Sequence, residues 1–129
     1  MQLLFVIVLV LNLLVEGFAA FSLIAGPGGL SAAGTGNQWS MHYGFAAVAI
    51  ASASLWIWPR RTDLNAVTVV LGILLVFHTG LAVSLATAGD QQAGMVIHVV
   101  LAALSLVAFA RRSSWCAPAS GGSIRGEST

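Results

Sequence analysis

The chain has 129 residues, a formal net charge of +1, 58% hydrophobic residues and only 7% charged residues, whereas a soluble domain carries about 25% charged residues. Four acidic residues and five arginines cannot cover a water-exposed surface, which excludes an ordinary soluble enzyme, a disordered chain and a nucleic-acid binder. The absence of lysine excludes Schiff-base cofactors, and the single cysteine, Cys116, excludes a disulfide within the chain or a thiolate metal cage. The composition therefore predicts an integral membrane protein whose main partner is the lipid bilayer.

Four apolar stretches follow one another along the chain, each close to the ~20 residues that a helix needs to cross a membrane. They predict helices at residues 2–24, 40–58, 65–86 and 92–110. None alternates apolar and polar residues as the strands of a membrane barrel do. We therefore expect an all-α fold, a polytopic bundle of four transmembrane helices in one domain over residues 1–112. The polar residues 113–129 are expected to form a disordered cytoplasmic tail that supplies no apolar face to the bundle.

The first apolar stretch also has some features of a secretory signal peptide. It lacks the positively charged start of such a peptide, and its apolar run continues past the small residues Ala19 and Ala20 to Ile24. These two features favour a helix that is retained in the membrane.

The arginines predict the orientation of the bundle. Arg60 and Arg61 lie between the second and third helices, and Arg111 and Arg112 follow the fourth, whereas residues 25–39 contain no Lys or Arg. Residues 87–91 lack them as well. Because positively charged loops stay in the cytoplasm, we expect both termini to be cytoplasmic, in a plasma membrane of the prokaryotic kind.

Each predicted helix carries one strongly ionisable side chain, namely Glu16, His42, His78 or His98. With a rise of ~1.5 Å per residue, Glu16 and His78 lie roughly 12 Å below the outer helix ends, His98 roughly 9 Å and His42 roughly 3 Å. We therefore expect Glu16, His78 and His98 to share one layer in the outer half, with His42 above them near the surface. Asn12 lies one turn before Glu16, so its amide is expected to hydrogen-bond the carboxyl group.

Small residues at helical spacing predict which faces pack together, because they let helix backbones approach closely. On the second helix these residues are Gly44, Ala47, Ala51 and Ser54. On the fourth helix they are Gly94, Ala102 and Ser105, in line with His98. This pattern predicts that His98 faces the interior of the bundle.

These residues are compatible with several kinds of site. Glu16, His42, His78 and His98 are candidate ligands for zinc, copper or iron, because carboxylate and imidazole suit borderline divalent metals. His78 and His98 on neighbouring antiparallel helices are alternatively candidate axial ligands of a haem. Glu16 with Asn12 is a candidate proton relay, and the same groups could instead only tie the helices together.

The sequence leaves three functions open. The first is a non-enzymatic module that binds a metal or a haem, and the second is an accessory or assembly subunit of a larger membrane complex. The third is a homo-oligomeric proton-coupled transporter that uses Glu16. An enzyme is the least favoured class, because no nucleophile–base pair can be recognised and the loops are too short to build a soluble active site. No nucleic-acid partner is expected.

Overall fold

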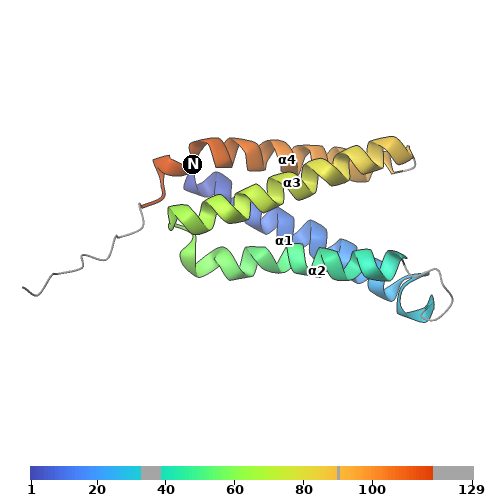
Figure 1. The fold of residues 1–129 in the computed structure, drawn as a ribbon. Coiled ribbons are helices and arrows are strands. Elements are labelled where there is room, and N and C mark those ends of the chain that lie inside the picture. The colour runs from blue at the N-terminus through green and yellow to red at the C-terminus, as the bar shows by residue number, and fades with distance from the viewer. Residues whose placement is uncertain (33–38, 90, 118–129) are drawn as a thin grey trace, which may run out of the picture.

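The structure is a computed structural model that describes residues 1–32, 39–89 and 91–117. Within these ranges the chain forms four α-helices: α1 (Gln2–Ala25), α2 (Trp39–Ile57), α3 (Leu64–Ala88) and α4 (Gln92–Arg111) (Figure 1). Three 3-10 helices accompany them: η1 (Leu30–Ala32), η2 (Trp58–Arg60) and η3 (Arg112–Ser114). The all-helical prediction is confirmed, and every predicted helix boundary lies within two residues of the observed one.

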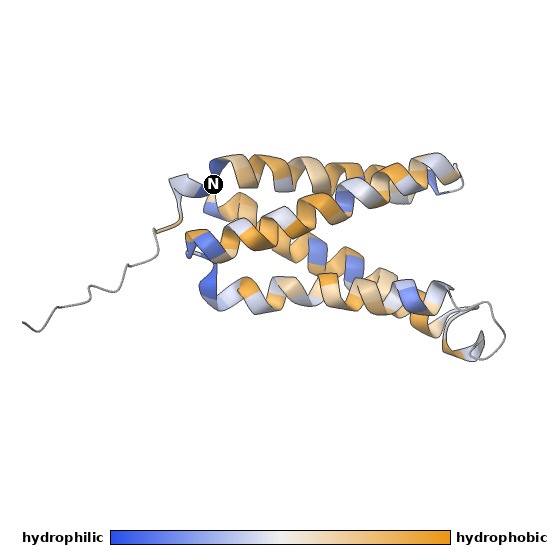
Figure 2. Ribbon diagram, in the orientation of Figure 1, coloured by the Kyte–Doolittle hydropathy of each residue, from blue (hydrophilic) through white to orange (hydrophobic). Residues whose placement is uncertain are grey.

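Each of the four α-helices is long and apolar enough to cross a membrane. Figure 2 shows apolar residues over most of their length, interrupted by short polar bands. Large apolar side chains also point outward, for example Phe18, Phe21 and Val76, each more than 70% exposed. A helix that is apolar on all sides is typical of a bundle surrounded by hydrocarbon.

Short connections join α2 to α3 and α3 to α4, so each of these pairs is antiparallel. The Asp63 carboxylate accepts hydrogen bonds from the backbone N–H groups of Asn65 at 2.9 Å and Ala66 at 3.2 Å, and so caps the start of α3. At the other end of α3, Gly89 has a φ of 75° and its N–H donates to the Leu85 carbonyl. Glycine suits this left-handed position, and only three residues lie between the end of α3 and the start of α4.

The bundle consists of two helical hairpins. Helix α1 packs mainly on α2 and α3 mainly on α4, whereas α1 with α4 and α2 with α3 share smaller contacts. The hairpins approach each other at the end that carries Met1, and they diverge toward the opposite end (Figure 1). We call the end that carries Met1 the terminal end, and residues 58–64 and 111–117 also lie there. The opposite end of the bundle is the far end.

The main apolar core lies at the terminal end. It contains residues from all four helices and from the chain after α4: Phe5, Val8, Leu9, Ile57, Val67, Leu71, Leu74, Ala108 and Cys116. On α3 the buried positions 67, 71, 74, 78 and 82 recur every three or four residues, so they form one face of the helix. The buried polar residues lie further along the same helix faces. Packing of the apolar core therefore also positions these polar residues.

The start of the predicted tail packs on the bundle, which corrects the expectation that residues from 113 onward supply no apolar face. The ring of Trp115 lies 6.0 Å from that of Phe5, and Cys116 belongs to the apolar core. The Ala117 N–H donates to the Thr62 carbonyl at 2.9 Å. The chain turns back over the end of the bundle through η3, a turn that composition does not predict. Residues 118–129, the rest of the predicted tail, lie outside the described part of the chain.

The packed position of Cys116 also affects its chemistry. Burial raises the pKa of the thiol, the nearby Asp63 carboxylate raises it further, and Arg112 acts in the opposite direction. A thiol with a raised pKa stays protonated at neutral pH and is a poor nucleophile. Cys116 therefore contributes to the apolar core as a protonated thiol.

Candidate metal centre

Three ionisable side chains from three helices meet inside the bundle. Glu16 of α1 and His78 of α3 are 0% exposed, and His98 of α4 is 7% exposed. The Nδ1 atoms of the two histidines lie 3.0 Å apart. The Glu16 Oε1 atom lies 3.6 Å from Nδ1 of His98 and 3.8 Å from Nδ1 of His78. The convergence predicted from the calculated depths is therefore found.

These side chains meet because each continues a packing face of its helix. The predicted face of α2 is confirmed, since Gly44, Ala47, Ala51 and Ser54 are all buried. On α4 the buried residues are His98, Leu101, Ser105 and Ala108, which confirms the inward orientation of His98. On α1 Asn12 and Glu16 are buried on the face that begins with Phe5.

Asn12 contacts helices other than its own. Its Nδ2 atom donates to the Ile50 carbonyl and to Ser54 Oγ, both at 2.9 Å. Its Oδ1 atom lies 3.2 Å from Nε2 of His78. The expected hydrogen bond from Asn12 to Glu16 is therefore wrong, because both amide hydrogens point toward α2. Asn12 instead links α1 to α2 and α3.

The contacts of Asn12 define the proton positions on His78. A carbonyl oxygen can only accept, so the group of Asn12 that faces Ile50 is the NH₂ group, and the Oδ1 atom faces His78. His78 must then carry a proton on Nε2 and donate it to Asn12. In the neutral ring the Nδ1 atom has a free lone pair, which points toward His98 and Glu16. Metal-binding histidines are commonly oriented in this way by an acceptor on the second ring nitrogen.

The Glu16 carboxyl group is buried without a hydrogen bond among the described residues. Its contacts with the two histidines, at 3.6 and 3.8 Å, are too long for direct hydrogen bonds. A buried carboxylate without a partner is costly, so this group needs a nearby cation or proton.

The spacing of the three donor atoms suits a small divalent ion. In a tetrahedral zinc site with Zn–N bonds of 2.0–2.1 Å, neighbouring donor atoms lie about 3.3 Å apart. The observed separations of 3.0, 3.6 and 3.8 Å bracket this value. The group of donor atoms that could hold a metal consists, within the described ranges, of Glu16, His78 and His98. Two imidazoles and one carboxylate would leave a fourth position open to another ligand.

A haem held between His78 and His98 does not fit this arrangement. Axial ligands lie on opposite faces of the macrocycle, so a porphyrin plane must pass between the two rings. Here the rings are stacked with centroids 5.3 Å apart, and their facing nitrogens are 3.0 Å apart. There is no space for a macrocycle between them.

His42 lies apart from this group. Its side chain is exposed, and its ring meets that of Trp39 edge to face at 6.4 Å. Ser54 joins the polar group because it accepts a hydrogen bond from Asn12 Nδ2. The sequence predicts only a packing role for Ser54, on the small-residue face of α2.

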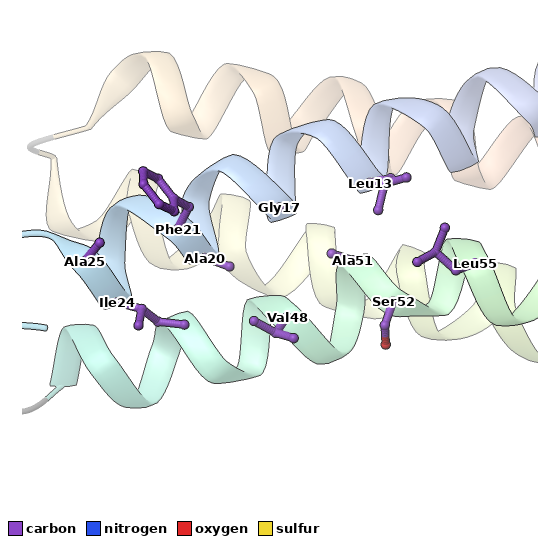
Figure 3. A pocket seen from close by; sticks show the side chains of 10 residues that line it. All are labelled: Leu13, Gly17, Ala20, Phe21, Ile24, Ala25, Val48, Ala51, Ser52 and Leu55. Atoms are coloured by element: carbon purple, nitrogen blue, oxygen red, sulfur yellow. The ribbon is translucent and has the colours of Figure 1, made fainter. Parts of the chain in front are cut away.

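A shallow hollow of about 530 Å³ lies on the outer surface of the α1–α2 hairpin (Figure 3). Small and apolar residues line it, among them Gly17, Ala20, Val48 and Ser52. The described residues of its lining include no ionisable side chain and none of the three candidate metal ligands.

Comparison with family models, with curated proteins and with solved structures finds no match to this chain. The class of the protein is therefore defined by its own geometry. It is a small helical protein with four helices that are long and apolar enough to cross a membrane. Inside it lies a buried Glu/His group that could hold a metal.

Proposed function

We propose that this protein is an integral membrane protein that binds one divalent transition-metal ion, such as zinc, inside its helical bundle. The ligands are Oε1 of Glu16 and the Nδ1 atoms of His78 and His98. The observation that carries the proposal is the buried Glu16 carboxyl group, which has no hydrogen-bond partner in the described ranges and faces both nitrogens. A bound cation would offset the cost of burying this carboxylate.

The donor set also supports a choice among metals. Without a thiolate, the site favours borderline ions such as Zn²⁺, Cu²⁺ or Fe²⁺, for which imidazole and carboxylate are common ligands. Asn12 supports the site because it holds the His78 ring through Nε2 and leaves Nδ1 free. The ligands come from both hairpins, so metal binding would join α1 to α3 and α4.

The experiment is metal binding by the purified protein in mild detergent, with Co²⁺ as a spectroscopic substitute for Zn²⁺. We expect one Co²⁺ per chain with visible absorption bands of a low-coordinate site. Glu16→Gln and His98→Ala should weaken Co²⁺ binding at least about 100-fold, because each removes one of three ligands.

Two variants serve as matched controls for this experiment. His42→Ala removes an exposed imidazole on α2, and Ser105→Ala changes a buried residue two turns from His98 on the same face of α4. Both should bind Co²⁺ like the unaltered chain. Equal losses in His42→Ala and His98→Ala would contradict the proposed ligand set.

We further propose that the helices cross the membrane with both termini in the cytoplasm and the metal centre in the outer half. The four arginines that flank the helices, residues 60, 61, 111 and 112, support this orientation, since they all belong to the terminal end. In a chain with Cys116→Ala, a cysteine introduced by Ser31→Cys should react with an impermeant thiol reagent in intact cells, whereas one introduced by Arg61→Cys should not. The reverse labelling pattern would overturn the orientation.

A proton relay is the second candidate, favoured by the 3.0 Å contact between the two histidine Nδ1 atoms. At that distance one proton can be shared between the rings when no metal is bound. Folded protein that takes up no Co²⁺ or Zn²⁺, yet changes the pH inside proteoliposomes in a manner abolished by Glu16→Gln, would favour the relay over the metal centre.

A further inference from the structure

A pocket of about 610 Å³ lies between the two hairpins toward the far end of the bundle. All four helices contribute to its walls, and His98 is one of its lining residues, so the pocket borders the candidate metal centre. Its apolar walls include Val15, Phe18, Leu23, Leu81, Leu85 and Ile97. Its volume lies within the range of roughly 300–1,000 Å³ that is typical of small-molecule sites.

The polar groups of the pocket are few. Besides His98 they belong to Ser22, Tyr43, Ser84 and Gln91, and the described residues of the lining include no acidic residue, lysine or arginine. Phe18 and Ile97 are 73% and 43% exposed on the outside of the bundle. The pocket is therefore bordered by the surface that lipid would cover, and an apolar molecule could enter it from the bilayer.

The pocket approaches the metal centre from the His98 side. His98 is 7% exposed, whereas Glu16 and His78 are both 0% exposed. A metal held by three protein ligands has an open fourth position, and the pocket is the side from which another ligand can reach it.

We propose that this pocket binds a small amphiphile, whose oxygen-bearing head group coordinates the metal and whose hydrocarbon body fills the apolar walls. This inference rests on the proposed metal centre. A strongly hydrated ion would find no charged partner among the described lining residues, whereas a molecule with an apolar body would bury hydrocarbon against side chains on all four helices.

The test uses the Co²⁺-loaded full chain in detergent, with octanohydroxamate and acetohydroxamate as probes. Both have the same metal-binding head group, and they differ only in the length of the hydrocarbon body. We expect the longer probe to change the Co²⁺ spectrum at a concentration at least about 30-fold lower, because each buried methylene group adds affinity.

Ala19→Phe fills the pocket from α1, since Ala19 is one of its lining residues. The variant should keep one Co²⁺ per chain and reduce the preference for the longer probe at least about tenfold. Partitioning of the longer probe into detergent affects the unaltered chain and the variant equally. It therefore cancels when their preferences are compared. Ala103→Phe, the same change at an exposed position of α4, is the control and should keep the full preference. If Ala19→Phe does not fold, Ser84→Phe fills the same pocket from α3.

The outcomes separate this inference from the metal centre. Failure of the unaltered chain to bind Co²⁺ would overturn the metal centre itself. Stoichiometric Co²⁺ with equal responses to both probes, or with a preference that Ala19→Phe and Ser84→Phe leave unchanged, would overturn the amphiphile site alone.

Discussion

The two ends of the bundle use the same four helices in opposite ways. At the terminal end, apolar side chains such as Phe5, Leu71 and Leu74 fill the space between the hairpins without exposed surface. Toward the far end, the hairpins diverge around a pocket and a polar group that contains Asn12, Glu16 and two histidines. Close packing holds the hairpins together at one end, whereas polar contacts connect them further along.

This difference separates a closely packed part of the bundle from a part that contains a pocket and buried polar groups. Apolar packing depends on shape and gives a rigid end, because a well-filled interior resists changes in volume. Polar contacts inside an apolar bundle depend on the direction of each hydrogen bond, and here a pocket lies beside them. The closely packed terminal end therefore aligns the helices, and the Glu/His group that could hold a metal lies beyond it, where the hairpins diverge.

The largest expected effect follows from removing core volume at the terminal end. Leu71→Ala, at a residue that is 0% exposed, should lower the free energy of unfolding by about 2–5 kcal/mol, because it creates a cavity. Leu81→Ala, at a half-buried residue that lines the pocket, should cost clearly less. Denaturant unfolding in detergent micelles measures both, and equal costs would contradict the distinction between the two ends.

Metal binding should stabilise the bundle where the hairpins diverge. At a free Zn²⁺ concentration of 100 times the Kd, binding to the folded state alone should add about 2.7 kcal/mol to the free energy of unfolding. The increase should disappear in Glu16→Gln and persist in His42→Ala. A thermal shift assay with and without Zn²⁺ measures this, and an equal Zn²⁺ effect in Glu16→Gln would place the metal elsewhere.

A smaller effect should separate two truncations of the chain. Ending the chain after Arg112 removes Trp115, Cys116 and the backbone hydrogen bonds of Ala117, so we expect a loss of about 1–2 kcal/mol. Ending it after Ala117 keeps these contacts and serves as the control. If both truncated chains unfold like the full chain, residues 113–117 do not contribute to the stability of the terminal end.

The helices and the buried faces of α2 and α4 could be predicted from the sequence, because both depend on local pattern. A run of about 20 apolar residues must satisfy its backbone hydrogen bonds internally, which selects a helix in an apolar setting. Small residues such as Gly44 and Ala47 recur at helical spacing and identified the packed side of α2. Similar distances from the helix ends likewise placed Glu16, His78 and His98 in one layer.

The partners of the side chains could not be predicted in the same way. Asn12 and Glu16 are one turn apart, which suggested a hydrogen bond within α1, but Asn12 is directed to Ile50, Ser54 and His78 on other helices. The haem alternative depended on the distance between the rings of His78 and His98, which the sequence does not give. In the structure the two rings are stacked, so no macrocycle fits between them. The packing of Trp115 depends on the turn after α4 and on the position of Phe5.

The sequence by itself determined an all-helical fold, four helices suited to a membrane, the inward faces of α2 and α4, and one layer of ionisable residues. These properties follow from hydropathy and from the 3.6-residue period, and both are local to each helix. Only the tertiary structure decided that Asn12 supports His78, that Glu16 faces two nitrogen atoms, and that a pocket borders His98. Such contacts depend on the rotation and register of one helix against another, and these are set by how all the side chains between the helices pack together.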